Sequence, residues 1–371
     1  MTAETLAFLV LTIMTVPLVG IVSMALPWVQ REGEVFAVTI PTSACDDVRI
    51  RGFKVRYTLA MALVTAGATA LVVSAVMMGG QGPATVSLIV AVLLIPALSF
   101  ALMLLFRSRT MGLKREMGWE TTSAKHSAIV AEVDIPGPVS LGWEALNVPV
   151  IIATFAVGLI LYPSMPDQVP MHMDLTGAVT DWTAKSTAII VFPVLVQVVI
   201  LASMVLAHWG ITHSKKASSP SAPVSSAYAY GLYAHAQSVL LVVLGVVINL
   251  AMVCIPLSFA GIMTLPVAAL VVTLVAMVSA VASMVMGLVY GQAGSRIVAR
   301  VEAAADMPAD DDSHWAAGVL YVNRDEPALF LPERFGMGWT VNLARPAVWA
   351  IIAGFVAVIV ALLVFSMTTL G

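Results

Sequence analysis

Residues 187–206 read TAIIVFPVLVQVVILASMVL, twenty residues without a charged side chain. A helix of this length is about 30 Å long, which matches the hydrocarbon core of a bilayer. Similar runs recur along the 371-residue chain, which is 60% hydrophobic and only 11% charged, whereas soluble domains carry about 25% charged residues. The sequence therefore predicts an all-α polytopic membrane protein, because lipid offers no partner to an open backbone.

Eight runs are long and apolar enough to be transmembrane helices. They cover 5–27, 58–78, 86–106, 146–162, 187–206, 237–258, 264–288 and 347–367. The first run exceeds the apolar core of a signal peptide, so we expect it to remain as a span. Cys45 lies in a charged loop and Cys254 in an apolar run, and we expect no disulfide between them.

Basic residues predict the orientation of these helices. All but one of the 18 Lys and Arg residues fall in the loops after the first, third, fifth and seventh spans, and Lys185 is the exception. The positive-inside rule then makes those loops cytoplasmic and both termini extracytoplasmic. We expect a multi-pass protein of the cytoplasmic (inner) membrane with the lipid bilayer as its surroundings. The sequence contains no basic run that would indicate a nucleic-acid partner.

The predicted spans divide the chain into six parts. These are an N-terminal three-helix region with cytoplasmic loops (1–139), two helices with an external connector (140–206), a Ser/Pro/Ala-rich cytoplasmic linker (207–228), helices six and seven (229–291), a small cytoplasmic module between helices seven and eight (292–346), and the last helix (347–371).

The predicted spans contain no Lys, Arg, Asp or Glu, which argues against a proton pump or an ion-coupled carrier. Gln197, Gln237 and Asn249 are their prominent polar residues, and we expect Asn249 to bond a neighbouring helix. Small residues recur every four positions over 62–74 and 279–291, a pattern that favours close helix packing, within one chain or across a homodimer.

The external connector, 163–186, reads PSMPDQVPMHMDLTGAVTDWTAKS. Its three prolines hold the chain extended and turned. His172 and Asp174 are two residues apart and would face one side of an extended segment, and LTG, ending at Gly177, is a turn signal. Asp181, Trp182 and Lys185 precede the next span.

Three interpretations of this connector remain open. It forms a structural cap with Trp182 at the membrane interface, or it recognises an external peptide or lipid, or His172 with Asp174 and a further Asp (Asp167 or Asp181) holds a metal. A metal site normally needs three or four ligands, so we expect no metal or other cofactor. The motifs H-E-x-x-H and G-x-S-x-G and the P-loop are all missing from the sequence, which argues against an enzyme.

Two cytoplasmic segments carry further signals. EVFAVTIP at 34–41 is strand-like. Segment 292–345 begins as a helical extension of the seventh span, continues through the acidic tract 306–315, and ends in strand-like runs. We interpret the acidic tract, including Asp310, Asp311, Asp312 and His314, as a solvated loop, with a metal site as the alternative.

The connector resembles the membrane domain of unknown function 1648, which occurs in SdpI-type bacteriocin-immunity proteins, through Pro170, His172, Gly177, Trp182 and Lys185. Segment 319–346 is similar to the domain of unknown function 5808 through Asn323, Asp325, Pro327, Pro332, Arg334, Gly336, Gly338, Trp339, Asn342 and Pro346. In the first family, one member protects its host from a secreted toxic peptide and sequesters a repressor at the membrane.

The resemblance implies a non-enzymatic bacterial membrane protein that senses or neutralises an envelope-active agent and signals to a cytoplasmic regulatory protein. A small-molecule or lipid transporter and a metal-dependent membrane enzyme using His172 are the alternatives. The candidate recognition residues in the connector are Pro170, His172, Asp174, Gly177, Asp181, Trp182 and Lys185. Those in the cytoplasmic module are Asn323, Asp325, Arg334, Gly336, Gly338, Trp339 and Asn342.

Overall fold

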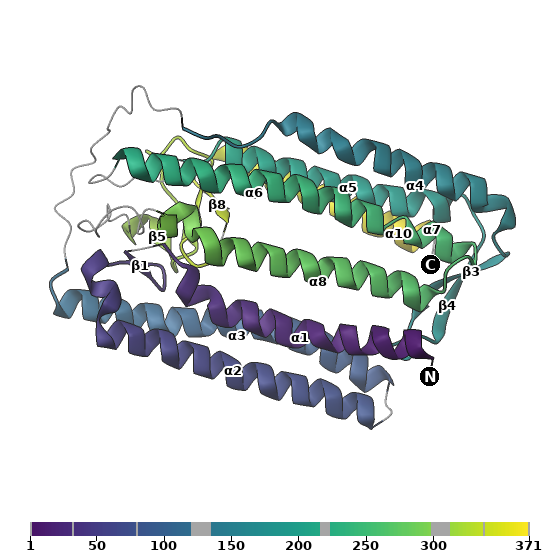
Figure 1. The fold of residues 1–371 in the computed structure, drawn as a ribbon, viewed down its shortest axis with the longest axis horizontal. Coiled ribbons are helices and arrows are strands. Elements are labelled where there is room, and N and C mark those ends of the chain that lie inside the picture. The colour runs from purple at the N-terminus through teal and green to yellow at the C-terminus, as the bar shows by residue number, and fades with distance from the viewer. Residues whose placement is uncertain are drawn as a thin grey trace.

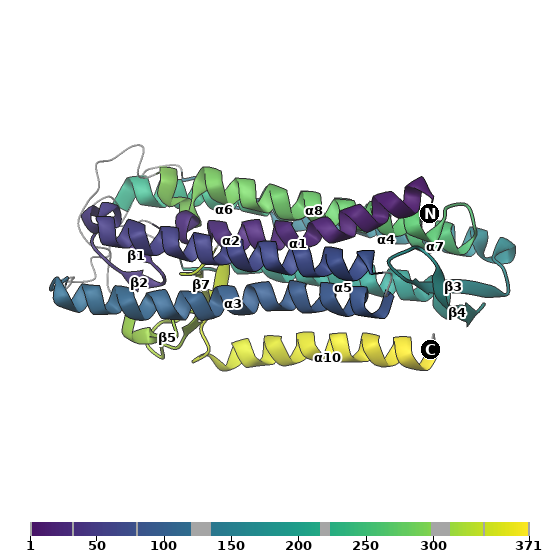
Figure 2. The same ribbon diagram turned by 90° about the horizontal axis from the view of Figure 1, so that it is seen from below.

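The computed structural model of the protein is a bundle of long helices that run along one common axis (Figures 1 and 2). It describes residues 2–31, 33–78, 81–119, 135–215, 223–297, 312–336 and 338–369. Within these ranges eight helical segments are long and apolar enough to cross a membrane, which confirms the predicted class of an all-α polytopic membrane protein.

The helices of the bundle are α1 (Ala3–Val29), α2 (Val48–Met77), α3 (Gln81–Glu116), α4 (Asn147–Leu161), α5 (Ala188–Thr212), α6 (Pro223–Ala251), α7 (Cys254–Phe259), α8 (Leu265–Tyr290) and α10 (Pro346–Thr369). A 3₁₀ helix, η2 (Leu141–Leu146), leads into α4, and the short α7 continues the span of α6. Cys45 and Cys254 are both free, so the prediction of no disulfide between them is confirmed.

Several helices extend beyond the apolar runs that predict them. α2 begins at Val48, ten residues before the predicted span, and α3 continues to Glu116. Hydropathy detects only the part of a helix that matches lipid, whereas the backbone bonds continue into the basic segments. The predicted helical extension of the seventh span is interrupted at its start, because α8 ends at Tyr290 and Gly291 adopts φ +67°. A 3₁₀ turn, η4 (Gln292–Gly294), and a helical segment at 295–297 follow, and the rest of the predicted extension lies outside the described residues.

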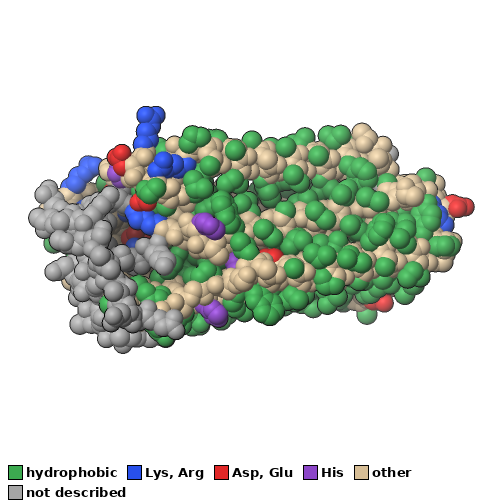
Figure 3. All heavy atoms as spheres, turned by 90° about the horizontal axis from the view of Figure 1, so that it is seen from above, with side chains coloured by type: hydrophobic (Ala, Val, Ile, Leu, Met, Phe, Trp, Pro, Cys, Tyr) green, Lys and Arg blue, Asp and Glu red, His purple; other side chains and the backbone are tan. Residues whose placement is uncertain are grey.

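Two groups of three helices pack side by side and α8 joins them. α1, α2 and α3 form one group and α4, α5 and α6 the other, while α8 packs against α1 and α6 (Figure 1). α10 packs chiefly against α5 and lies at the edge of the bundle (Figure 2). Hydrophobic side chains cover the middle of the molecule, as expected for contact with lipid (Figure 3).

The two rows of small residues have different surroundings. In the row on α8, Ser279 and Gly287 are buried within the chain. In the row on α2, Ala66, Ala70 and Ser74 are exposed. The α8 row therefore serves packing within the bundle, whereas the α2 row lies on the lipid-facing surface.

In the part of the chain that the structure describes, four two-stranded antiparallel hairpins lie at the ends of the bundle. The hairpin of β3 (Gln168–Met173) and β4 (Val179–Ala184) lies at the end that also holds both chain termini (Figure 1). At the opposite end lie β1 (Glu34–Val35) with β2 (Val38–Thr39), β5 (Trp315–Ala316) with β6 (Leu320–Tyr321), and β7 (Phe330–Pro332) with β8 (Trp339–Val341). The strand-like pattern at 34–41 is thus confirmed.

A buried core joins the β1–β2 hairpin to α1, α2 and α3. Phe36 is fully buried and its ring lies 5.2 Å from Phe106 and 5.7 Å from Tyr57. Phe36 and Ala37 form the turn with φ of +48° and +59°, a conformation that side chains other than glycine rarely adopt. Burial of the Phe36 ring stabilises this turn, which presents its backbone groups to the polar cluster described below.

Candidate functional site: a hairpin and a module at opposite ends

The connector (163–186) is built around the β3–β4 hairpin, and Asp174 shapes its turn. One Asp174 carboxylate oxygen accepts hydrogen bonds from the Thr176 backbone N–H (2.7 Å), the Thr176 hydroxyl (2.6 Å) and the Ala178 N–H (3.1 Å). Gly177 completes the turn with φ +78°. Asp174 is therefore a turn-forming residue, as Asp often is where its side chain can bond the backbone two residues on.

His172 pairs with Asp181 across the hairpin, 3.2 Å from Nδ1 to Oδ2. Both side chains are exposed, at 73% and 55%. Register shifts on both sides of His172 interrupt the strand alternation on which the predicted common face of His172 and Asp174 depends. Among the described residues no three His, Cys, Asp or Glu side chains gather as metal ligands, so the structure does not support the metal interpretation.

Lys185 fixes the base of the connector. Its ammonium group donates to the Met165 carbonyl (2.9 Å) and lies 4.9 Å from the centre of the Tyr162 ring. Pro170 stands opposite Trp182 in the strand register, and Trp182 is 53% exposed. The connector is thus ordered by Lys185 and Asp174, and it leaves Trp182, His172 and Asp181 accessible.

The tip of the hairpin packs against the first turns of two helices. A Cβ atom at Gly177 would lie 3.0 Å from the Thr5 hydroxyl of α1 and 3.1 Å from Pro266 of α8. The same two helix ends are joined to each other by the Thr264 hydroxyl, which donates to Glu4 at 2.9 Å. The hairpin therefore rests on α1 and α8.

At the opposite end, residues 312–336 and 338–345 form what we call the module, and Asn342 is its central residue. Asn342 is fully buried. Its amide NH₂ donates to the carbonyls of Asn323 (2.8 Å) and Glu326 (3.0 Å), while its amide oxygen accepts from the N–H of Asn323 (3.1 Å). Asn323 in turn accepts from the N–H of Asp325 (2.8 Å). The two asparagines thus join the segment that follows β6 to the end of β8.

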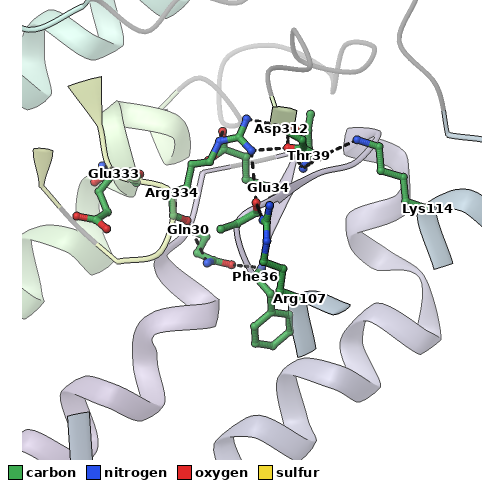
Figure 4. Close-up of polar contacts among 11 residues, drawn as sticks. Gln30, Glu34, Phe36, Thr39, Arg107, Lys114, Asp312, Glu333 and Arg334 are labelled. Carbon is green, nitrogen blue, oxygen red and sulfur yellow. Dashed lines mark hydrogen bonds and ion pairs between the residues drawn. The ribbon is translucent and has the colours of Figure 1, made fainter. Parts of the chain in front are cut away.

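Arg334 connects the module to the β1–β2 hairpin (Figure 4). It is 3% exposed, and its guanidinium bonds the Asp312 carboxylate, the Thr39 hydroxyl (3.0 Å) and the Ala37 carbonyl (3.3 Å). The Glu34 carboxylate lies 3.7 Å from Arg334 Nε, and the centre of the Trp315 ring lies 5.0 Å from Arg334 Cζ.

Asp312 forms ion pairs with two cationic side chains, Arg334 and Lys114 of α3, and Lys114 lies 2.8 Å from it. Burial favours its protonated form, but the charges and hydrogen bonds of Arg334 and Lys114 prevail and hold the pKa of Asp312 below its ordinary value. The predicted solvated acidic loop is therefore wrong at Asp312, because this carboxylate bonds Lys114 and Arg334. Asp310 and Asp311 lie outside the described residues.

Gln292 and Gln30 hold the turn between β7 and β8. Gln292, which follows α8, donates to the carbonyls of Glu333 (3.1 Å) and Gly338 (2.7 Å) and accepts from the Gly338 N–H (3.0 Å). Gln30, which follows α1, donates to the Arg334 carbonyl (3.1 Å) and accepts from Phe36 (2.9 Å). The ends of α1 and α8 are thus both bonded to the module.

Gly336 and Gly338 adopt φ of +125° and +120° in this turn, which explains why glycine occupies both positions. Trp339 packs against Tyr233 of α6, with 5.5 Å between ring centres. The Glu333 side chain points away from the Arg334 cluster (Figure 4), and burial raises its pKa to about 7.

Buried polar residues form a chain inside the bundle, and the sequence analysis identified only some of them. Glu144 of η2 lies 3.0 Å from His208 of α5, and the chain continues through Asn147 to Asn249 (2.7 Å). Gln197 donates to the Asn249 carbonyl and to Thr154, each at 2.8 Å. The expected interhelical bond of Asn249 is therefore confirmed. Glu144 and His208 were overlooked because each lies two residues outside a predicted span.

Comparison with known families agrees with the two resemblances. Residues 150–196 match the domain of unknown function DUF1648, and residues 325–349 match the family of unknown function DUF5808. No curated protein and no solved structure matches the chain. The first match contains every candidate residue of the connector, and the second contains every module candidate except Asn323. The chain is thus a multi-span membrane protein that carries a DUF1648 domain and a DUF5808 segment.

Proposed function

We propose that the protein is a non-enzymatic membrane sensor or immunity protein of the SdpI-like type. In this proposal the connector lies outside the inner membrane and meets an envelope-active peptide or similar agent. The module lies in the cytoplasm and reports to a regulatory protein. The alternation of basic residues along the chain supports this orientation.

One observation carries the proposal: two helices touch the connector at one end and the module at the other. α8 contacts Gly177 through Pro266 and is followed by Gln292, which bonds the β7–β8 turn. α1 contacts Gly177 through Thr5 and is followed by Gln30, which bonds the Arg334 carbonyl. With 26 residues, α8 is about 39 Å long and can transmit a displacement across the bilayer as a unit.

The exposed side chains of the connector suit a peptide or a lipid headgroup. Trp182 offers an indole ring to an apolar group, while the His172–Asp181 pair offers a donor and an acceptor next to it. Hydrogen bonds and packing hold the backbone beneath them, so binding at these side chains would press on α1 and α8 instead of reordering a loose loop.

Protection and hydrogen exchange together test the proposal. Cells that express the chain are exposed to a panel of envelope-active peptides, and exchange in 330–341 of the purified protein is followed as a protective peptide is added. We expect survival to rise at least tenfold for one class of peptide, and exchange to change at the module. Unchanged killing across the panel together with unchanged exchange would refute the proposal.

Two variants separate binding from transmission. Trp182→Ala should abolish both protection and the exchange change, whereas Trp143→Ala, at a tryptophan of similar exposure on η2, should abolish neither. Gln292→Leu should leave peptide binding intact but remove the exchange change, because the α8 contact to Gly338 is lost. A Gln292→Leu protein that still transmits would exclude α8 as the route.

A transporter is the second candidate, and the buried chain from Glu144 to Gln197 favours it, because polar residues inside a bundle often line transport routes. Proteoliposomes loaded with labelled small molecules or lipids would test it. Uptake that Gln197→Leu abolishes, with Gln237→Leu as the control, would favour transport over sensing.

A further inference from the structure

Glu144 and His208 form an ion-pairing contact that is removed from water. Their side chains are 2% and 0% exposed, and Glu144 Oε1 lies 3.0 Å from His208 Nδ1. The other ring nitrogen of His208, Nε2, lies 2.9 Å from the Val139 carbonyl oxygen. Both nitrogens of the ring therefore face an oxygen acceptor.

This geometry fixes the number of protons that the pair holds. A carbonyl oxygen can only accept, so Nε2 must carry a hydrogen. Between Nδ1 and Oε1 one further hydrogen is required, on the ring or on the carboxyl group, because otherwise two lone pairs would face each other. A neutral histidine beside an ionised glutamate has one hydrogen too few.

We propose that Glu144 and His208 together form a proton-binding site inside the bundle, which holds one proton more than a neutral imidazole and a carboxylate would. The ligand is the proton itself, and it is held either as imidazolium with carboxylate or as imidazole with carboxylic acid. In both forms the pair is electrically neutral, which suits a position at the edge of the hydrocarbon core.

The elements that pack against the pair contain few other titratable groups. On α6 these are Tyr228, Tyr230, Tyr233 and His235, while α4 and α10 contain none and α5 contains only His208. His235 is exposed and its Nδ1 lies 2.9 Å from the Gly137 carbonyl, two residues from Val139. The described elements thus bring no second acid or base into direct contact with the Glu144–His208 pair.

The carboxylate also orients the amides that follow it. Glu144 Oε2 accepts from the Asn147 NH₂ group (3.3 Å), so the Asn147 oxygen faces Asn249 and accepts from its NH₂ group (2.7 Å). The Asn249 oxygen is then left without a hydrogen-bond donor among the described residues, and so is the Gln197 oxygen. The proton state of Glu144 is therefore linked by direct bonds to groups on α4 and α6.

Loss of the proton would place the Glu144 carboxylate against an unprotonated ring nitrogen. The contact that holds η2 and Val139 on α5 would then be repulsive. α5 leads directly to Ser214, which forms an isolated bridge with Phe330 of the module. Loss of the proton from the Glu144–His208 pair would therefore change how α5 holds the module.

Nitrogen NMR of ¹⁵N-histidine-labelled, full-length protein in nanodiscs at pH 7.5 tests the proposal, with an infrared spectrum of the carboxyl region. His208→Gln identifies the His208 signals among the six histidines. We expect either two ring N–H groups on His208, or one together with a protonated carboxyl group that disappears in Glu144→Gln. One ring N–H together with an ionised Glu144 would overturn the proposal.

Glu144→Gln distinguishes a proton site from a structural contact. A glutamine can donate to an unprotonated Nδ1 while Nε2–H still bonds Val139, so the contact persists with one proton fewer. We expect a single ring N–H on His208 in this variant, and unchanged spectra for His213, an exposed histidine at the end of α5. Two ring N–H groups in the folded variant would also overturn the proposal. If the variant fails to fold, the wild-type measurement decides alone.

Discussion

At the scale of single residues, the module depends on the Asn342 side-chain amide, whose NH₂ group and oxygen each need their own partners. Asn342 donates to two carbonyls and accepts from an N–H, all in a site closed to water. Asn342→Asp replaces the donor by an acceptor that faces the carbonyls of Asn323 and Glu326. Leaving buried acceptors unpaired costs about 1–3 kcal/mol each, so we expect the module to lose about 3 kcal/mol of stability, measured by hydrogen exchange over 320–345.

Asn323→Asp is the matched control for that change. Among the described residues, the Asn323 side-chain NH₂ bonds only the Tyr321 hydroxyl, at 3.1 Å, and a hydroxyl can donate to a carboxylate instead. We expect a loss of about 1 kcal/mol or less. Equal losses for the two variants would mean that buried charge, and not the arrangement of donors, determines the result.

Glu333 predicts a pH dependence of module stability. Its pKa is about 7 in the folded protein against an ordinary value of 4.5. Between these values the folded module binds a proton that the unfolded chain does not, so this contribution to stability is full below about pH 4.5 and is lost as the pH rises toward 7. The difference between the two pKa values corresponds to about 3 kcal/mol of stability.

Glu333→Gln should remove this slope and make the module about 2–3 kcal/mol more stable than the wild type at pH 8, with little difference at pH 4.5. Local unfolding followed by hydrogen exchange at the two pH values would measure it. The exposed Glu116 provides the control variant, Glu116→Gln, which should keep the wild-type slope. A wild-type module whose stability rises from pH 5 to pH 8 would contradict the assigned burial of Glu333.

The sequence identified many of these residues but not their partners. Asn342, Arg334 and Asn323 stood out through the resemblance, yet nothing in the sequence linked Arg334 to Thr39 or Asp312 to Lys114, which are 295 and 198 residues apart. Such pairs arise from the packing of α1, α3 and the module at one end of the bundle. Periodicity reports which residues share a face of one helix and is silent on contacts between distant segments.

At the scale of elements, the β3–β4 turn combines an unusual backbone conformation with a close contact. Gly177→Ala adds a methyl group where φ is +78° and where Thr5 and Pro266 are about 3 Å away. Gly261→Ala is the matched control, since Gly261 has φ +72° and nothing within 4 Å. Each should cost about 1–2 kcal/mol through the left-handed backbone, and Gly177→Ala should cost about 1 kcal/mol more through displaced docking.

Thermal unfolding in detergent would measure the two losses, and exchange at 172–181 would report docking of the turn. Equal effects of Gly177→Ala and Gly261→Ala would show that the connector does not press on α1 and α8. That result would also remove the physical basis of transmission from the connector.

The existence of each transmembrane helix was predictable, whereas the ends of the helices were not. Apolar length sufficed for all eight spans because lipid demands a continuous helix. The break of α8 at Gly291 was missed because the segment after it keeps a helical composition, although Gly291 takes φ +67° and Gln292 bonds Gly338 there.

At the scale of the whole molecule, the protein places polar recognition groups at both ends of an apolar bundle. Hydrophobic side chains cover the middle, and Lys and Arg gather chiefly at one end (Figure 3). This asymmetry follows from the positive-inside rule and gives the two ends different tasks in the proposed function. The orientation of the bundle is therefore the assumption on which the roles of connector and module both depend.

Cysteine labelling of intact cells would test this orientation. In a chain with Cys45→Ser and Cys254→Ser, a single cysteine is introduced at Ala178 of the hairpin tip or at Ala316 of β5, both of which are exposed. Ala178→Cys should react with a membrane-impermeant maleimide before lysis, because the basic residues hold the opposite end inside. Ala316→Cys should react only after the membrane is opened. Both sites are exposed alanines replaced by cysteine, so the two thiols are similarly accessible to the reagent. The reverse labelling pattern would therefore mean that the bundle is inverted. The connector could then no longer meet an external agent.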